Sequence, residues 1–316
     1  MAASASTPAS TSIPTTGLTP GEHSATVPKT KLHMRKETNL WRDAWARLLR
    51  NKLAVIGMSI VLFFLFLAVF ANVIAPYAYD KTDFAQTYQF PSWAHPFGTS
   101  PLGQDMLSRL IYGARVSMIV GLGSQVIMLL IGVPLGALAG FYGGKTDLYL
   151  MRFVDVMYAF PTLLFVILIM SALGPGMTNI FIALGLTGWV TLCRLTRAQM
   201  LSLREKEYVL AAHAVGAGSG RIILKHLLPN ALTPLIIAIT FGIPQAIFTE
   251  AALSFIGVGI SPPTPSWGQM VGEYQTYIRS YWYLTTFPSI AIGLTMLAFS
   301  FLGDGLRDAL DPRMKR

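Results

Sequence analysis

The chain has 316 residues and is poor in charge and in cysteine. Charged residues make up 12% of it, hydrophobic residues make up 53%, and the mean hydropathy is +0.52. These values exclude an ordinary soluble domain and indicate an integral membrane protein. A single cysteine, Cys193, excludes a disulfide within the chain. The five histidines lack the spacing of a metal site, so we expect neither a bound metal nor a catalytic residue.

Ionisable residues are also scarce within the apolar stretches. Ion-coupled transport usually needs several of them inside the membrane, so we expect the energy for any transport to come from outside this chain. Glu250 is the most deeply placed acid, and Ser254 follows it by one helical turn. Two interpretations remain open. Glu250 and Ser254 face a translocation path, or Glu250 makes a structural hydrogen bond to a neighbouring helix or subunit.

A phosphate-binding loop is missing as well. The string from Ala139 to Thr146 ends in Gly-Lys-Thr, but Ala139 stands where such a loop has its first glycine. A phosphate-binding loop joins a strand to a helix, whereas this string lies between two apolar stretches. We therefore expect no ATP binding by this chain.

What the sequence does contain is a series of apolar stretches long enough to cross a membrane, which takes roughly twenty residues per helix. Six stretches qualify, at residues 53–75, 116–140, 153–173, 180–195, 227–258 and 284–302. We predict an all-α, polytopic protein with six transmembrane helices. Within the second stretch, Gly132, Gly136 and Gly140 have four-residue spacing, which favours close helix packing over a binding role.

Lys and Arg are unevenly distributed over the loops. If both termini and the loops near 145 and 210 share one side, that side has 20 of them and the other side has four. The positive-inside rule then makes both termini cytoplasmic. The net charge of +9 is mostly this topology signal, and the charges are spread over four segments without interleaved aromatics. We expect no nucleic-acid partner.

The domain organisation follows from this topology. Residues 1–35 are rich in Ser, Thr, Ala and Pro and predict a disordered cytosolic tail. Residues 36–52 fit a helix lying on the membrane lipid, and an ordinary charged flank fits equally well. The remaining parts are a first transmembrane helix (53–75), an extracytoplasmic segment (76–115), a core with five transmembrane helices (116–304) and a cytosolic tail (305–316).

One basic loop contains a short amphipathic helix, predicted at residues 207–217. Tyr208, Ala211, Ala212 and Val215 recur at helical spacing and share one small, nearly flat face. Gly216 follows and lets the chain turn. A structured polar loop between apolar spans is typical of a surface that docks another protein.

Further motifs lie in a fixed order along the chain. They are Pro96-Phe97-Gly98-Thr99 with Gly103, Asp105, Ser108 and Arg109; the strings 111–115, 140–144, 173–176, 207–230 and 250–255; and the strings 262–268 and 303–308. Together they resemble the inner-membrane permease subunit of a type I ABC importer, specifically the C-type permease of the dipeptide/oligopeptide family. The resemblance covers residues 36–313 and implies the fold of that permease in a bacterial plasma membrane.

The resemblance makes the helix at 207–217 a coupling helix, which docks into a cleft of an ATPase subunit. The family pattern places its two alanines on Ala211 and Ala212 and its glycine on Gly216, whereas Leu210 stands at its glutamate position. The residues that we expect at the ATPase are Tyr208, Val209, Leu210, Ala211, Ala212, His213, Val215, Gly216, Arg221 and His226.

The implied partners are a second permease subunit, two ATP-binding cassette ATPases that bind ATP and Mg, and an extracytoplasmic substrate-binding protein. The chain would form half of a pore for di- or oligopeptides and work by alternating access. The residues expected to face the binding protein are Gly98, Thr99, Asp105, Pro263 and Trp267; simple anchoring of Trp267 at the membrane interface is an equal alternative. Permeases for nickel, glutathione and oligosaccharide share this pattern. An ion-coupled secondary transporter is the alternative from another class.

Overall fold

The computed structural model describes residues 40–311, and within this part every regular element is a helix. One isolated bridge joins Thr99 to Asp105. Five helices of this described part are long and apolar enough to cross a membrane, and the number is six if a bent pair of helices counts as one span. This confirms the predicted all-α class with several spans. The tail at 1–35, the first four residues of the segment 36–52, and residues 312–316 lie outside the described part.

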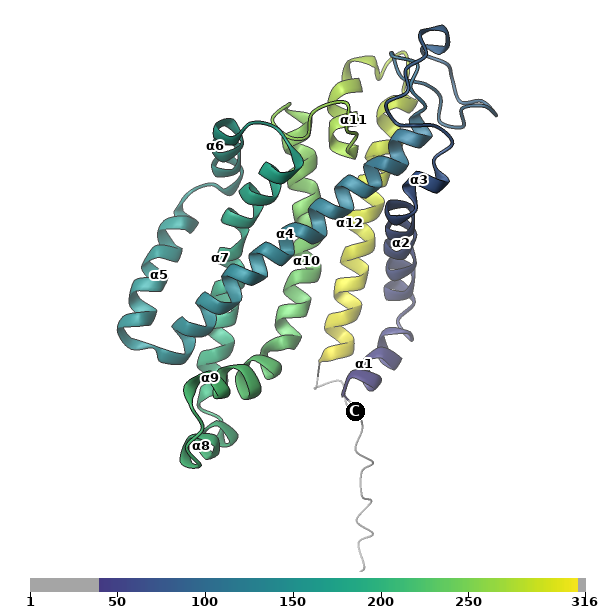
Figure 1. Ribbon diagram of the computed structural model, residues 1–316. Coiled ribbons are helices and arrows are strands. Elements are labelled where there is room, and N and C mark those ends of the chain that lie inside the picture. The colour runs from purple at the N-terminus through teal and green to yellow at the C-terminus, as the bar shows by residue number, and fades with distance from the viewer. Residues whose placement is uncertain (1–39, 312–316) are drawn as a thin grey trace, which may run out of the picture. The chain divides into compact units, whose positions relative to one another are not determined.

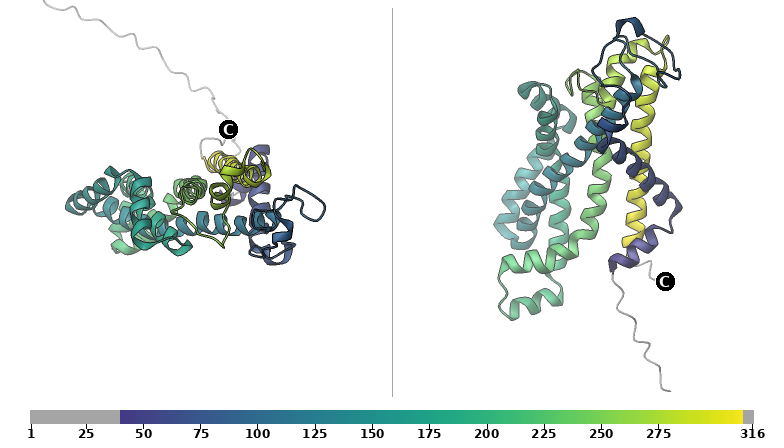
Figure 2. Two further views of the ribbon diagram at one scale, coloured as in Figure 1. Left: turned by 90° about the horizontal axis from the view of Figure 1, so that it is seen from above. Right: turned by 45° about the vertical axis from the view of Figure 1, so that its right-hand side comes forward.

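The long helices pack beside one another (Figure 1). They are α2 (Lys52–Val69), α4 (Met106–Tyr142), α7 (Met177–Arg204), α10 (Leu228–Phe255) and α12 (Tyr283–Leu310). α4 crosses the others diagonally, from α2 and α12 near one end to α7 near the other (Figures 1 and 2). α8 (Glu207–Ala214) and α11 (Trp267–Tyr274) lie at opposite ends, which we call the α8 end and the α11 end.

The shorter elements lie at the two ends. They are α1 (Leu40–Leu48), α3 (Ala71–Ile74), the 3-10 turns η1 (Phe84–Gln86) and η3 (Gln275–Tyr277), α9 (Ser219–Ile222) and the π-helical turn η2 (Ile223–Leu227). α9, η2 and α10 form one continuous helical stretch, Ser219–Phe255. α1 packs on the end of α12 through Ala44 and Leu48, and its Trp41 and Trp45 are half exposed.

Several helix ends differ from the sequence-based expectation. α4 begins at Met106 rather than at 116, because the Asp105 side chain caps it by accepting from the Ser108 backbone N–H. α12 continues to Leu310, where Ala309 and Leu310 are buried against α1, so residues 305–310 are helix rather than tail. α2 ends at Val69 instead of at 75.

The third predicted span, 153–173, is wrong as a single straight helix. The chain there forms α5 (Gly144–Ala159) and α6 (Thr162–Leu173), which are bent by 84° relative to each other. Phe160 has an extended backbone before Pro161, because proline disfavours the helical conformation in the residue that precedes it. α5 is attached to α7 by an ion pair of Asp155 with Arg194 at 2.6 Å and by a second pair of Asp147 with Arg197.

α4 and α7 pack backbone to backbone at the three spaced glycines. A Cβ added to Gly132, Gly136 or Gly140 would lie 2.3–2.6 Å from a carbonyl oxygen of α7, closer than real Cβ atoms come. The predicted close packing is therefore confirmed. The string from Ala139 to Thr146, which resembles a phosphate-binding loop, forms the end of α4 and the start of α5, with no strand beside it.

Gly136→Ala is expected to destabilise the folded protein by about 1–3 kcal/mol, because the new methyl group meets the Cys193 carbonyl oxygen at 2.3 Å. Thermal unfolding of the purified protein in detergent measures this change. Gly293→Ala in α12 is the matched control, since a Cβ there meets nothing within 4 Å. Equal unfolding midpoints for the two variants would show that the helices can move apart at no cost.

Candidate functional site

α8 is a short helix that joins the ends of two long ones. It follows α7 directly and leads through α9 and η2 into α10. Gly216 ends the turn after α8 with φ of +82°, a conformation that favours glycine, and its N–H donates to the His213 carbonyl at 2.9 Å. α8 therefore links α7 to the helical stretch that contains α10.

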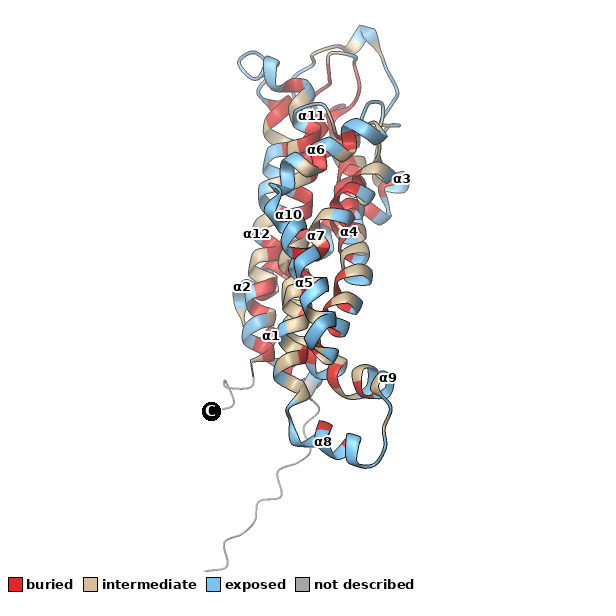
Figure 3. Ribbon diagram, turned by 90° about the vertical axis from the view of Figure 1, so that its left-hand side faces the viewer, coloured by how far each residue is buried: buried red, intermediate tan, exposed pale blue. Residues whose placement is uncertain are grey.

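The two faces of α8 differ from the expected ones. Val209 and Ala212 are buried and belong to the same core cluster as Ile222 and Leu227. These two residues were expected to meet a partner, but they hold α8 onto the rest of the chain. Leu210 and Val215 have 58% and 84% of their surface exposed. Figure 3 shows that most of α8 is exposed.

The other residues expected on this surface remain accessible. Tyr208, Ala211, His213, Gly216 and Arg221 are exposed, and His226 is partly buried. Beside α8 runs a groove of about 570 Å³, here called the α8 groove, which is lined by Phe141, Tyr142, Arg204, Glu205, Leu210, His213 and Ser219. Phe141 and Tyr142, at the end of α4, also line this groove. These two residues were not predicted from the sequence, because they are distant from residue 210 along the chain.

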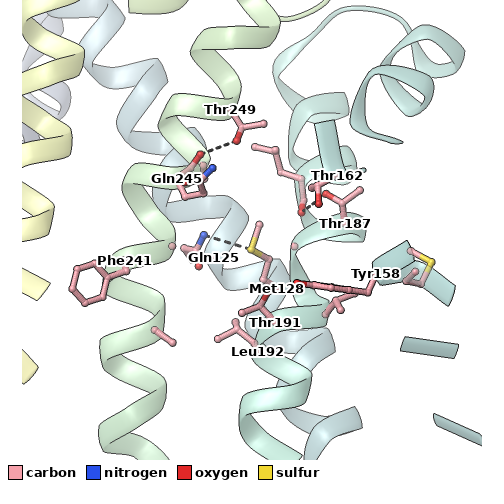
Figure 4. A pocket seen from close by; sticks show the side chains of 17 residues that line it. Gln125, Met128, Tyr158, Thr162, Thr187, Thr191, Leu192, Phe241, Gln245 and Thr249 are labelled. Atoms are coloured by element: carbon pink, nitrogen blue, oxygen red, sulfur yellow. Dashed lines mark hydrogen bonds between the residues drawn. The ribbon is translucent and has the colours of Figure 1, made fainter. Parts of the chain in front are cut away.

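A second cavity, of about 520 Å³, lies among the long helices (Figure 4). Its walls come from α4, α5, α6, α7 and α10, and it contains no Asp, Glu, Lys, Arg or His. Its polar side chains are Gln125, Tyr158, Thr162, Thr187, Thr191, Gln245 and Thr249. The sequence signal for it was weak: a few neutral polar residues recurring on apolar helices.

Glu250 lies outside this cavity and is fully buried. Its carboxylate accepts hydrogen bonds from the hydroxyls of Ser266 at 2.7 Å, Ser254 at 2.8 Å and Ser117 at 3.5 Å. It thus connects α10 with α4 and with the N-cap of α11. The position fits the structural interpretation and differs from the expected place on a path, because Ser254 also faces this network instead of the cavity.

The expected receiving surface at the α11 end is mostly interior. Gly98, Thr99 and Asp105 are buried, and Pro263 alone of the five proposed residues is exposed. Trp267 has no exposed surface, since its indole N–H donates to the Leu110 carbonyl at 3.0 Å. Four of the five residues that were expected to face the binding protein are therefore enclosed by the chain itself.

Buried polar contacts explain why these residues are inside. Asp105 binds His95 Nδ1 at 2.8 Å, and His95 Nε2 lies 2.7 Å from Gln86 Oε1. Arg109, 1% exposed, donates to Gln104 Oε1 at 2.6 Å and to Glu273 at 3.4 Å. The segment between α3 and α4 is thus fixed on α4 and α11. The large apolar side chains that it exposes are Phe84, Phe90, Trp93 and Leu102.

Two family models match this chain. Residues 132–316 match the one described as a binding-protein-dependent transport system inner membrane component, and residues 39–91 match the N-terminal TM domain of oligopeptide transport permease C. The chain belongs to this family of transport permeases. This confirms the ABC permease subunit predicted from its motifs and makes it a multi-pass component of the inner membrane.

Curated relatives extend the likeness over most of this permease. The oligopeptide permease OppC of Bacillus subtilis (strain 168) is 42% identical over 89% of this chain and 92% of its own length. The dipeptide permease DppC of the same organism is 44% identical over 89% of this chain and 88% of its own length. The glutathione permease GsiD of Pectobacterium atrosepticum is 38% identical over 87% of this chain and 92% of its own length.

A solved structure supports the fold of this permease. An inward-facing form of the MetNI methionine ABC transporter matches with a TM-score of 0.52, over 65% of this chain and 98% of that chain. At 20% sequence identity this likeness concerns the fold alone. It agrees with the ABC importer permease fold predicted from the sequence.

Proposed function

We propose that this permease imports di- and oligopeptides as one half of an ATP-driven translocation path. A second permease subunit forms the other half, two ATPase subunits bind ATP and Mg, and an extracytoplasmic binding protein delivers the peptide. The observation that carries the proposal is the exposure of the short helix α8, on which Leu210 is 58% exposed and after which Val215 is 84% exposed. Peptide as the substrate class rests on the relatives named for oligopeptide and dipeptide transport.

In this proposal the α8 end and both termini are cytoplasmic. An ATPase holds α8, and closure of the two ATPases on ATP moves it. Because Val209 and Ala212 attach α8 to the α9–η2 turn, its displacement is passed to α10 and, directly through the chain, to α7. Both helices line the cavity, so movement of α8 would change its width. The chain itself supplies no catalytic residue.

The cavity is the proposed half of the path. Polar side chains exposed on a membrane helix need protein or water around them, because lipid offers no hydrogen-bond partner. Gln245 is exposed near the middle of α10, and the neighbouring second permease would enclose it. Residues on the cavity side of α10 replace Glu250 and Ser254 as the path residues in this proposal.

Reconstitution tests the proposed function. Liposomes containing this chain, a second permease, both ATPases and the binding protein should accumulate a labelled dipeptide when ATP is inside with the ATPases. Nickel, glutathione and an oligosaccharide serve as alternative substrates under the same conditions. Steady uptake by this chain alone, or uptake driven by an ion gradient without ATP, would overturn the proposal in favour of a secondary transporter.

A further inference from the structure

Two glutamine side chains face the cavity, one from α4 and one from α10 (Figure 4). The amide nitrogen of Gln125 lies 3.5 Å from the sulfur of Met128, which is a weak acceptor. The side chain of Gln245 makes no hydrogen bond within residues 40–311. Both amides therefore keep donors and acceptors free for a molecule in the cavity.

Two of the four threonines that line the cavity differ from the glutamines in this respect. The Thr187 hydroxyl donates to the Ala183 carbonyl at 2.9 Å, and the Thr249 hydroxyl donates to the Gln245 backbone carbonyl at 2.8 Å. These hydroxyl protons are used within their own helices, as is common for threonine in apolar helices. Among the cavity's side chains the glutamine amides are the ones that offer both a carbonyl acceptor and N–H donors in the same planar group as a peptide bond.

Gly242 determines where one of these amides lies. A Cβ on Gly242 would come within 2.3 Å of Gln125 Oε1, so the amide occupies the space that a side chain would fill. Gln125 is 5% exposed and held between α4 and α10. The more exposed Gln245 follows Gly242 on the same helix, by three residues. One amide is fixed by packing and the other is free to move.

An uncharged amide is chemically complementary to a peptide bond, because each has one carbonyl acceptor and an N–H donor. It does not attract or repel a charged side chain as an ionised group does. Since the cavity has no Asp, Glu, Lys, Arg or His, passage through it would not depend on the charge of the solute.

We infer that Gln125 and Gln245 bind the backbone amides of a peptide in transit, so that this step accepts peptides regardless of side-chain charge. The inference rests on the proposed peptide transport. It adds the two residues that let the path accept peptides with differently charged side chains. It also excludes charge selection by this part of the permease, leaving such selection to the delivering protein.

Variants that place a charge at the exposed Gln245 test the inference in the reconstituted complex. Three dipeptides of equal length, containing Lys, Glu or only neutral side chains, are compared at saturating binding protein. Gln245→Glu should raise the Lys-to-Glu uptake ratio by about tenfold, and Gln245→Lys should lower it by a similar factor, since about 1.4 kcal/mol of charge interaction suffices. Gln199→Glu and Gln199→Lys, in α7 outside the cavity, should leave the ratio unchanged.

A second pair of variants remains informative if the charged ones fail to fold. In the Gln125→Leu/Gln245→Leu double variant, uptake of all three dipeptides should fall by the same factor. The wild-type preference for a dipeptide over its ester analogue, which lacks the amide N–H, should disappear. Unchanged ratios in folded variants, with normal wild-type peptide uptake, would overturn this inference alone. No peptide uptake by the wild-type complex would overturn the proposed function and this inference with it.

Discussion

Val215→Asp is expected to lower ATP-driven uptake by about tenfold or more without reducing the amount of folded protein in the membrane. Val215 follows α8 directly and has 84% of its surface exposed, so the chain alone loses no packing when it is replaced. Docking on an ATPase would bury this side chain. Burial of a valine contributes about 1.5–3 kcal/mol, and burial of an unpaired carboxylate is strongly unfavourable.

Two measurements separate docking from folding in this variant. Size-exclusion profiles in detergent report on the fold, and ATP hydrolysis by the assembled complex reports on coupling. Val73→Asp is the matched control, because Val73 in α3 is also a valine and is 83% exposed. Uptake by this variant should stay near wild type. Val209→Asp should instead lose the folded protein, since Val209 has no exposed surface. Wild-type uptake by Val215→Asp would remove α8 as the docking element.

The periodicity of residues 207–217 correctly predicted a helix but not the partner of each face. Tyr208, Ala211, Ala212 and Val215 share a face in any helix. Which face of α8 is covered depends on the path of the chain after Gly216. Ile222 and Leu227 from that later segment join Val209 and Ala212 in one core cluster. Such a long-range contact has no local signal in the sequence. The sequence therefore predicted that this helix has a docking face, but it predicted the residues of that face only in part.

Hydropathy predicted the spans because lipid requires long apolar helices, and this requirement is visible along the sequence. Hydropathy failed to predict the helix ends at which polar residues continue the helix. Ser108 and Arg109 read as loop residues, yet both lie in the first turn of α4, because Asp105 and Gln104 supply their partners. The bend at Pro161 had a local signal, whereas its angle of 84° depends on the packing of α6 against α7.

The motif residues of the α11 end were expected to contact the binding protein because their segments resemble the extracytoplasmic region of the permease family. They are conspicuous in the sequence for another reason: buried hydrogen bonds at Asp105 and Trp267 hold the segment in place. The cavity residues are not conspicuous in the sequence. Gln245 and Thr249 belong to no motif, and only the arrangement of α4, α7 and α10 around them indicates a role.

Glu250→Ala is expected to reduce the amount of folded permease in the membrane severalfold, while uptake per folded molecule stays near wild type. The substitution removes the acceptor of the Ser254 and Ser266 hydroxyls, which lie 2.8 and 2.7 Å from it. Each buried polar group left without a partner costs about 1–3 kcal/mol. Two such groups amount to a large part of a typical stability of about 5–15 kcal/mol.

The conservative variant Glu250→Gln adds a graded test. The Ser254 and Ser266 hydroxyls have little freedom to change from donating to accepting a hydrogen bond. Ser254 Oγ already accepts from the Ile260 N–H, and Ser266 Oγ accepts from the Gln269 N–H, each at 3.1 Å. In Glu250→Gln the amide oxygen can take the place of Oε1, which accepts from both of these hydroxyls, while the amide nitrogen replaces Oε2 near Ser117. The abundance of this variant should therefore fall between wild type and Glu250→Ala.

Gln245→Ala is the control with the reverse expectation, namely normal abundance with lower uptake per molecule, because Gln245 touches the cavity and holds no other helix. Quantitative immunoblotting of membranes, together with transport normalised to it, measures both quantities. If Glu250→Ala were abundant but inactive, Glu250 would act on the path after all, and the network around it would serve to hold a transport residue. If abundance and total uptake fall together, this deeply buried acid stabilises the wall of the path without touching what passes through it.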